Sequence, residues 1–289
     1  MAVLRVSDVD ALRCPTCRSP LAFGGAARSG RLVQGDLVCR GCARRYPVET
    51  GTAKLYREEE VKGTDRLLRR VYDGLPRVHD PLVRFSFPYA VGESERQSRS
   101  RYLPAIRLGD LAAETRGRRA RVLEVGAGTG SNVPLVREQS GGPVEIWAVD
   151  LSLGMLELLE ERLRFLGDDD TRCLAADAHA LPFPDSFFDR VFHVGAVNGY
   201  RDPRTALAEM ARVARPGTPI VVVDERLDPS QRHSLGHRLF FRWMTIYDRD
   251  PHAPVEHLPA DAEDVRVEQV GRFFYCMSFR SGGVAPRTA

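Results

Sequence analysis

The 289-residue sequence lacks long apolar runs and contains very little lysine. No stretch approaches the roughly 20 apolar residues that a helix needs to cross a bilayer. The first residues, MAVLRVSDVDALRC, include acids and no apolar segment of signal-peptide length. We therefore expect a cytoplasmic protein. Lys54 and Lys62 are the only lysines among 42 basic residues, a composition bias with little functional meaning because both side chains serve as surface cations.

The net charge is small but unevenly distributed. The whole chain carries +3, which is too little to indicate a polyanionic partner. Residues 1–57 hold ten Lys and Arg against four Asp and Glu, a net charge of +6, so the remainder carries −3. The basic N-terminal segment keeps contact with RNA open as an alternative.

Four of the six cysteines form two C-x-x-C pairs, Cys14 with Cys17 and Cys39 with Cys42. Two such pairs can complete a closed tetrahedral shell around a structural zinc ion. Disulfides are the alternative, and a reducing cytosol disfavours them. With few apolar residues nearby, this segment is expected to depend on the metal for folding. Cys173 and Cys276 stand alone beside apolar segments and are expected to be buried structural thiols.

The N-terminal segment resembles the small zinc-ribbon proteins that activate tRNA and protein methyltransferases. The resemblance covers residues 10–57 and rests on these motifs: Cys14-Pro15-x-Cys17, Pro20-Leu21, Cys39-x-x-Cys42 and Tyr46-Pro47-Val48. A similar ribbon precedes the bacterial ribosomal RNA guanine methyltransferases. The resemblance implies structural zinc and a possible protein partner, but no particular reaction.

From Arg121 onward, short apolar runs alternate with helical periodicity. Strands are expected at 121–126, 145–150, 172–177, 190–197 and 219–225, with amphipathic helices between them. The end of the chain predicts two strands around Gly271. This pattern predicts an α/β fold with a seven-stranded, mostly parallel Rossmann-like sheet covered by helices on both faces. The expected divisions are a zinc ribbon over 1–57, a helical lid or linker over 58–118, interrupted by prolines, and the Rossmann-like domain over 119–289.

The run VLEVGAGTGS follows the first of these strands and predicts a nucleotide-like ligand. Gly126 permits a tight turn and a close approach of the backbone, and Gly128 and Gly130 leave room for the ligand at the start of the next helix. A dinucleotide-binding pattern beginning at Gly126 also fits, and an acid at Asp150 would suit the ribose of either cofactor. Glu124, however, would repel a pyrophosphate and attract a cation, which favours S-adenosylmethionine.

Four runs resemble the class I S-adenosylmethionine-dependent methyltransferases, closest to the ubiquinone/menaquinone-type branch: VLEVGAGTGSN, AVDLSLGMLE, AADAHALPFPDSFFDRVF and ALAEMARVARPG. The resemblance spans about Val61 to Arg280. It implies that Glu124 and the three glycines hold the methionine portion and that Asp150 binds ribose. It also implies roles for the following residues: Leu151 and Met155 as walls of the adenine site, Asp177 and Ala178 at the adenine edge, and His193 beneath the sulfonium. A packed strand-end histidine is the alternative for His193.

Methyl transfer requires alignment of the acceptor and exclusion of water more than a fixed catalytic group. Tyr72, Asn198 and Glu225 are the catalytic candidates, and Tyr72-Asp73 resembles a Tyr-Asp pair of the related branch. His79, His237, His252 and His257 are expected to be surface or packing residues. The aromatic segment SLGHRLFFRWMTIY predicts a helix with Leu239, Phe240, Trp243 and Tyr247 on one face, either packed on the sheet or forming an apolar lid.

Three functions are consistent with these patterns. The first is methyl transfer to a small molecule, for which a hydrophobic or quinone-like acceptor fits the branch. The second is an RNA methyltransferase that grips phosphates through its basic ribbon, and the third is a catalytically silent binding protein. The sequence HVGAVNGY after the fourth strand lacks the Asn/Asp-Pro-Pro-aromatic motif of many enzymes that methylate nucleobase or protein amines. The absence of this motif favours methyl transfer to a small molecule.

Overall fold

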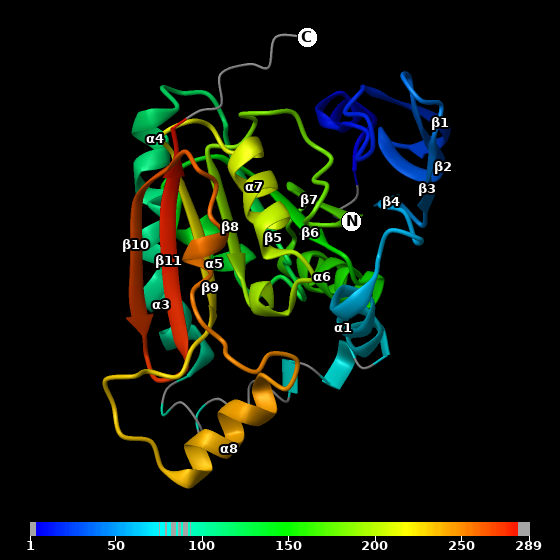
Figure 1. Ribbon diagram of the computed structural model, residues 1–289. Coiled ribbons are helices and arrows are strands. Elements are labelled where there is room, and N and C mark those ends of the chain that lie inside the picture. The colour runs from blue at the N-terminus through cyan, green and yellow to red at the C-terminus, as the bar shows by residue number, and fades with distance from the viewer. Residues whose placement is uncertain are drawn as a thin grey trace.

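The computed structural model describes residues 4–74, 76–78, 80–81, 85, 88, 92 and 94–282. In this part of the chain, eleven strands form one sheet in the order β1-β2-β3-β4-β7-β6-β5-β8-β9-β11-β10. Figure 1 shows the sheet running from the N-terminal ribbon to the C-terminal hairpin. None of the described helices combines the length and the apolar character needed to cross a membrane.

The Rossmann-like half confirms the predicted fold. Its parallel strands are β5 (Ala120–Val125), β6 (Val144–Asp150), β7 (Thr171–Ala176), β8 (Arg190–Val194) and β9 (Pro219–Glu225). The hairpin of β10 (Ala262–Val270) and β11 (Phe274–Ser281) closes the sheet, with β11 antiparallel to β9. Strand β8 is shorter than expected because Gly195 and Ala196 both turn with positive φ, of 85° and 80°.

Helices cover both faces of this sheet. The helices of the Rossmann-like half are α5 (Val133–Gln139), α6 (Leu153–Leu166), α7 (Pro203–Val213) and α8 (Leu235–Met244). Short 3-10 turns lie at Val197–Gly199 and Val255–His257. One face packs against α7 and the ribbon, and the other packs against α5, α6 and the helices that precede β5. The two hydrophobic clusters on opposite faces fix the strands in register.

The segment between the ribbon and β5 contains several helices, as predicted, although Pro104 lies inside a helix instead of ending one. They are α1 (Gly63–Gly74), α3 (Glu95–Ile106), a turn at Leu108–Asp110 and α4 (Leu111–Glu114). Tyr102, Leu103 and Ile106 of α3 are buried in the core on the α5 and α6 side. The boundaries 1–57, 58–118 and 119–289 remain predictions.

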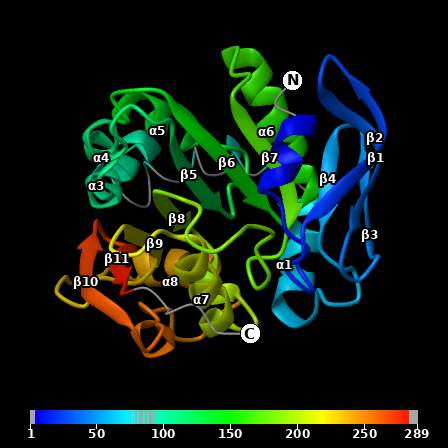
Figure 2. The same ribbon diagram turned by 90° about the horizontal axis from the view of Figure 1, so that it is seen from above.

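The ribbon is joined to the Rossmann sheet, which its sequence did not predict. It contains a 3-10 turn (Val6–Ala11), β1 (Leu21–Arg28), β2 (Arg31–Cys39), β3 (Arg45–Glu49) and β4 (Thr52–Leu55). Strand β4 pairs in parallel with β7, with Lys54 opposite Ala175 and Leu55 opposite Ala176. Figure 2, seen from above, shows β4 next to β7 at this edge. Ribbon residues such as Leu37 and Tyr46 share a hydrophobic cluster with Trp147.

Several basic side chains of the ribbon pair with acids of the Rossmann-like half. The ion pairs are Arg5 with Asp170 at 3.5 Å, Arg31 with Asp169 at 3.2 Å and Arg18 with Glu209 at 3.0 Å. In the reverse direction, Arg172 of β7 pairs with the buried Asp8 of the ribbon at 3.3 Å. Part of the charge asymmetry seen in the sequence is therefore balanced by acids of the same chain.

Candidate cofactor and zinc sites

One cavity lies at the carboxyl ends of the parallel strands, beside β5, where the strand order reverses. This is the position at which open α/β sheets bind ligands. Ten of the predicted site residues line it: Tyr72, Glu124, Gly126, Gly128, Asp150, Leu151, Met155, Asp177, Ala178 and Glu225. Gly130, His193 and Asn198 are not among the lining residues.

The glycines of the loop after β5 serve different purposes. Gly128 lines the cavity with a φ of 54°, and a Cβ there would meet nothing within 4 Å. Gly130 has a φ of 74°, and its Cβ would lie 1.9 Å from Leu159 Cδ1. Gly128 therefore leaves room for a ligand, whereas Gly130 allows α6 to approach the loop.

Glu124 is a buried carboxylate with an unused oxygen. Its Oε1 accepts a hydrogen bond of 2.6 Å from Asn132 Nδ2, and its Oε2 has no hydrogen-bond partner in the described structure. Burial raises the pKa of Glu124 to about 7, despite the hydrogen bond from Asn132. Such a group is stabilised by a cationic ligand that supplies the missing donor.

Asp150 ends β6 and holds the glycine loop in place. Its Oδ2 accepts from the Gly128 amide at 2.7 Å, and its Oδ1 accepts from the Ser152 amide at 2.8 Å. Burial raises its pKa, and these two amides oppose the shift. Each carboxylate oxygen has further lone pairs, so the predicted hydrogen bond from ribose is compatible with both contacts.

Asp177, at the end of β7, belongs to a cluster of charged groups that sequence reasoning missed. Its Oδ1 accepts from His179 Nδ1 at 2.5 Å, and its Oδ2 accepts from Arg201 at 3.2 Å. Burial tends to raise the pKa of Asp177, but the His179 hydrogen bond and the charges of His179 and Arg201 lower it overall. Arg201 also pairs with the buried Asp65 of α1. The cluster thus connects α1 to this edge of the cavity.

Helix α1 brings Tyr72 and Asp73 to the cavity from the preceding segment. Tyr72 and Leu68 line it, while Asp73 Oδ1 accepts from Ser152 Oγ at 2.6 Å and from the Gly154 amide at 3.2 Å. Asp73 thereby caps the first turn of α6, where a carboxylate is favourable. Burial raises the pKa of Tyr72, so its hydroxyl stays protonated at neutral pH.

The side of the cavity near β9 contains Glu225 and its supports. Glu225 Oε2 accepts from Tyr247 Oη at 2.7 Å, and Asn198 Nδ2 donates to the Glu225 carbonyl at 2.9 Å. The neighbouring Asp224 is fully buried and accepts from the amides of Ala196 and Asn198 at 3.0 and 2.6 Å. Asp224 therefore fixes the turn after β8, and Asn198 supports Glu225 rather than facing the cavity.

His193 lies behind the glycine loop instead of in the cavity lining. A Cβ on Gly126 would lie 3.0 Å from His193 Cε1. Its Nδ1 donates to the Val125 carbonyl at 2.7 Å, and burial lowers its pKa to about 4, so the ring is neutral at neutral pH. This arrangement matches the packing alternative stated for His193, and a contact with the sulfonium remains only a prediction.

Arg99 of α3 is a second residue that sequence reasoning missed. It lines the cavity and donates to Asn132 Oδ1 at 2.8 Å, beside the amide that contacts Glu124. A methionine portion carries a carboxylate as well as an ammonium group, so a site made only of acids was incomplete. The need for a positively charged partner for this carboxylate was the one sequence-level indication that an arginine should belong to the site.

These features fit S-adenosylmethionine. The unused Glu124 oxygen suits its ammonium group, Arg99 its carboxylate, and Asp150 its ribose, while Gly128 leaves space for the ligand. A pyrophosphate would instead lie beside Glu124, where like charges repel. The site therefore fits a cationic adenosyl ligand better than a dinucleotide.

The four ribbon cysteines come together as predicted. Their Sγ atoms all lie within 4.8 Å of one another, with Cys14 and Cys42 3.8 Å apart and Cys17 and Cys39 3.4 Å apart. Four thiolates around zinc at about 2.3 Å would be spaced by about 3.8 Å. Cys14, Cys17, Cys39 and Cys42 therefore fit a structural zinc ion. Cys173 and Cys276 are buried, as expected.

Contrary to expectation, the side chains of the aromatic segment do not share one face of the helix. Phe240 and Phe241 of α8 pack against Phe273, whereas Leu239 and Trp243 are exposed. Tyr247 follows the helix and turns toward Glu225. Of the other histidines, His237, His252 and His257 lie outside the cavity lining, and His79 lies outside the described residues.

Comparisons with known families agree with both sites. Residues 123–222 match the family described as a methyltransferase domain, and residues 9–51 match the Trm112p-like protein family. The ubiquinone/menaquinone biosynthesis C-methyltransferase UbiE of Burkholderia mallei is 36% identical over 104 residues. UbiE of Burkholderia thailandensis gives the same figures. The match covers 36% of this chain and 42% of these relatives, so it spans less than half of their length.

Solved structures support the fold. Phosphoethanolamine N-methyltransferase 2 of Haemonchus contortus, in complex with S-adenosyl-L-methionine, superposes with a TM-score of 0.53 at 15% identity. The superposition covers 78% of this chain and 61% of that one. At this identity the likeness concerns the fold alone. The chain therefore has a Rossmann-like fold in which residues 123–222 match a methyltransferase domain, and residues 9–51 before it match the Trm112p-like family.

Proposed function

We propose that this protein transfers a methyl group from S-adenosylmethionine to a small acceptor molecule. The observation that carries the proposal is the buried Glu124 carboxylate, whose Oε2 has no hydrogen-bond partner among the described residues and which belongs to the lining of the cavity. The cofactor supplies a methyl group already activated by the positive sulfur. The contribution of the chain is to bind, to orient and to exclude water.

The acceptor binds on the side of the cavity formed by Leu68, Tyr72, Val194 and Glu225. These residues come from α1, β8 and β9 and line the cavity together. Leu68 and Val194 offer apolar surface, and the protonated Tyr72 hydroxyl can donate a hydrogen bond to an acceptor oxygen. Such a mixture suits a largely apolar molecule with one polar group better than a flexible polyanion.

Glu225 is the residue to which we assign proton transfer. An acceptor with a hydroxyl group becomes a stronger nucleophile when a carboxylate takes the hydroxyl proton. The bond from the acceptor to the methyl carbon then forms as the bond from that carbon to sulfur breaks, which leaves the sulfur neutral. Tyr247 donates to Glu225 Oε2, and Asn198 donates to the Glu225 carbonyl. We therefore assign positioning roles to Tyr247 and Asn198, and the hydrogen-bond donor role to Tyr72.

Two observations favour a small acceptor over RNA. Arg5, Arg18 and Arg31 form ion pairs with carboxylates of the same chain, which reduces the charge that the ribbon offers to phosphates. The UbiE relatives are named as C-methyltransferases of ubiquinone and menaquinone biosynthesis. A phenolic or quinol-like acceptor that is methylated on carbon is consistent with both.

The test is incubation of a cell extract with the enzyme and isotopically labelled S-adenosylmethionine, followed by mass spectrometry. We expect label in an apolar metabolite and none in RNA. Glu225→Gln should reduce turnover while leaving cofactor affinity unchanged, and the exposed Glu138→Gln on α5 should change neither. Label that enters only RNA would contradict the small-molecule proposal. Absence of cofactor binding by calorimetry would contradict methyl transfer itself.

A further inference from the structure

Helix α8 exposes a continuous apolar face. Leu235, Leu239, Trp243 and Ile246 are 73%, 62%, 54% and 75% exposed. Their spacing of four, four and three residues places them on one side of the helix and of the turn that follows it. Apolar side chains that share one side of a helix are normally buried against the core of the protein. Because these four are exposed, we infer that this face contacts a partner outside the chain.

The same segment carries positive charge without any acid. Between Pro229 and Tyr247 there are three arginines, Arg232, Arg238 and Arg242, and no Asp or Glu. All three are exposed, and none has a carboxylate partner among the described ion pairs. On the helix, Arg238 and Arg242 lie beside the apolar side chains, where long arginine stems can reach past an apolar layer to charged headgroups.

The helix is held firmly in this position. Ser234 caps its first turn by accepting from the His237 amide at 3.1 Å. On the inner side, Phe240 and Phe241 pack against Phe273 with ring centroids 5.9 and 5.8 Å apart. Because the inner aromatics anchor α8, the outer face is not available for the core of its own chain.

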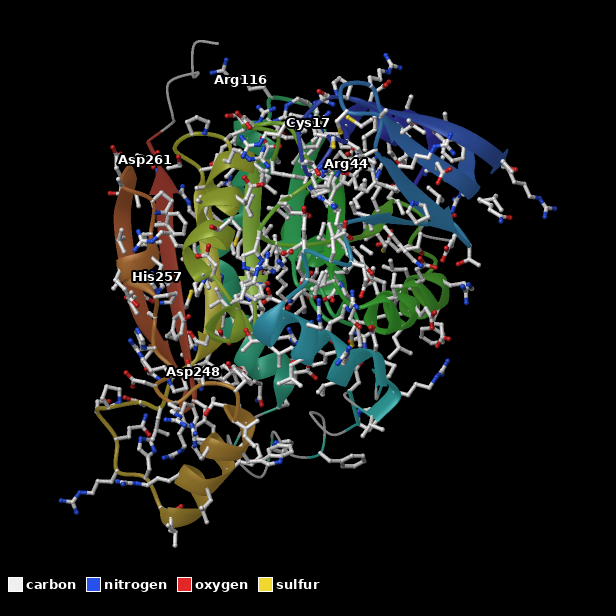
Figure 3. The ribbon with its side chains drawn as sticks, turned by 45° about the vertical axis from the view of Figure 1, so that its right-hand side comes forward. Cys17, Arg44, Arg116, Asp248, His257 and Asp261 are labelled. Carbon is white, nitrogen blue, oxygen red and sulfur yellow. The ribbon has the colours of Figure 1, made fainter. Side chains whose placement is uncertain are left out.

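We propose that α8 binds the surface of an anionic lipid bilayer. Amphipathic helices with leucine and tryptophan on one side and arginine along the boundary lie in the membrane interface. Figure 1 shows α8 projecting at one end of the molecule, and Figure 3 shows Asp248, just beyond it, far from Cys17 and Arg44 of the ribbon. A projecting helix offers no groove for a peptide, and two copies would bring their arginines together, which repel.

The surface that meets the lipid lies near the cavity. Tyr247, next to the exposed Ile246, donates to Glu225, which lines the cavity. A Cβ on Gly199 would contact both Tyr247 and Leu68 of α1, so the segment after α8 and helix α1 both lie beside Gly199. Leu67 and Val71 of α1 are also more than half exposed. Bilayer contact would therefore bring the cavity close to acceptors dissolved in lipid. This consequence rests on the proposed function, whereas the binding of α8 to the bilayer does not.

The fluorescence of Trp243 provides the first measurement. The other tryptophan, Trp147, is 1% exposed, so a blue shift on adding vesicles would report Trp243. We expect a shift with vesicles of phosphatidylglycerol and phosphatidylcholine, little with phosphatidylcholine alone, and loss of binding at high salt. No shift with the anionic vesicles at low salt would overturn the proposal.

Variants separate the apolar and ionic contributions in vesicle sedimentation. Leu239→Gln with Ile246→Gln should weaken partitioning by at least about tenfold. Arg238→Gln with Arg242→Gln should weaken it by about fivefold per arginine, on anionic vesicles only. Phe165→Gln, at a 90% exposed position on α6, is the matched control and should bind like wild type.

Thermal unfolding in the absence of cofactor verifies that each variant is folded. Equal partitioning of all variants and wild type would overturn the assignment to α8. Wild-type dimers in sedimentation equilibrium that dissociate on Leu239→Gln with Ile246→Gln would also overturn it, because the face would then belong to a second copy. Failure of methyl transfer with normal vesicle binding would affect only the proposed function.

Discussion

Glu124 is predicted to stabilise the cofactor complex while destabilising the free protein, so Glu124→Gln should have opposite effects on the two states. In the free protein the side chain is buried, and its pKa is raised from 4.5 to about 7. Gln keeps the size of the side chain and the oxygen that accepts from Asn132. It removes the ability to carry a negative charge and replaces Oε2 with an amide group that donates hydrogen bonds instead of accepting them.

The magnitude follows from the shift in pKa. A rise from 4.5 to about 7 corresponds to about 3 kcal/mol. Between these pH values the folded chain retains a proton that the unfolded chain has released, so the free energy of unfolding falls as pH rises. Near pH 4.5 the substitution should change little. Above pH 7.5, Glu124→Gln should be more stable than wild type by about 3 kcal/mol.

The cofactor should respond in the opposite direction. A hydrogen bond to a charged partner contributes about 1.5–3 kcal/mol, so Glu124→Gln should weaken S-adenosylmethionine binding by roughly 10-fold to 100-fold. Wild-type affinity should also rise between pH 6 and 8, as the carboxylate ionises, whereas the variant should show no such rise.

Urea unfolding at a series of pH values and isothermal titration calorimetry measure the two effects. Glu138→Gln is the control, because Glu138 is exposed on α5 and pairs with Arg96 at the surface. Its unfolding curve should follow wild type at each pH. Parallel pH dependence of wild type and Glu124→Gln would refute the reasoning, as would unchanged cofactor affinity.

Three further predictions concern the glycine loop, the end of β6 and the ribbon. Asp150→Ala should abolish S-adenosylmethionine binding in calorimetry and lower the free energy of unfolding by about 1–3 kcal/mol, because the Gly128 and Ser152 amides lose their acceptor; undiminished affinity would contradict the ribose role. Gly130→Val should cost at least about 2 kcal/mol in urea unfolding, since its Cβ would lie 1.9 Å from Leu159 Cδ1 at a φ of 74°; a normal unfolding midpoint would contradict this. Removal of zinc by a chelator should lower the melting temperature of the whole chain in calorimetry, because β4 belongs to the common sheet; an unchanged main transition would show that the ribbon folds separately.

The sequence predicted those features that depend on short stretches of chain. Apolar runs located β5, β6, β7 and β9 to within one residue of their observed ends. Strand-end acids and glycines indicated the cavity because parallel strands bring their carboxyl ends to one edge. The two C-x-x-C pairs indicated zinc because two intervening residues allow both thiolates of a pair to bind the same ion.

Side-chain direction was harder to predict at strand ends. Residues alternate between the two faces of β8, with Val191 in one hydrophobic cluster and Phe192 in the other. His193 therefore shares the face of Val191, behind Gly126, whereas the next residue, Val194, lines the cavity. Strict alternation, applied from the start of the strand, would have favoured the packing interpretation of His193.

Contacts between distant segments left no local signal. Arg99 belongs to a polar stretch of α3 with no periodic pattern around it, and only the charge balance of the ligand indicated that a cation was needed. Pairing of Lys54 with Ala175 spans more than a hundred residues and depends on the main chain, so side-chain identities did not indicate it. The surplus of arginine in the ribbon was visible, but its partners were not.

The junction between β4 and β7 connects the zinc ribbon to the cofactor cavity. Strand β4 pairs with Ala175 and Ala176, and Asp177 follows directly at the edge of the cavity. Arg201 then contacts both Asp177 and Asp65 of α1. Three segments thus meet at Asp177: the ribbon through the main chain, α1 through Arg201, and the Rossmann-like sheet through β6. The cavity edge expected to contact adenine therefore depends on all three being folded, which gives the ribbon a physical connection to cofactor affinity without any direct contact with the ligand.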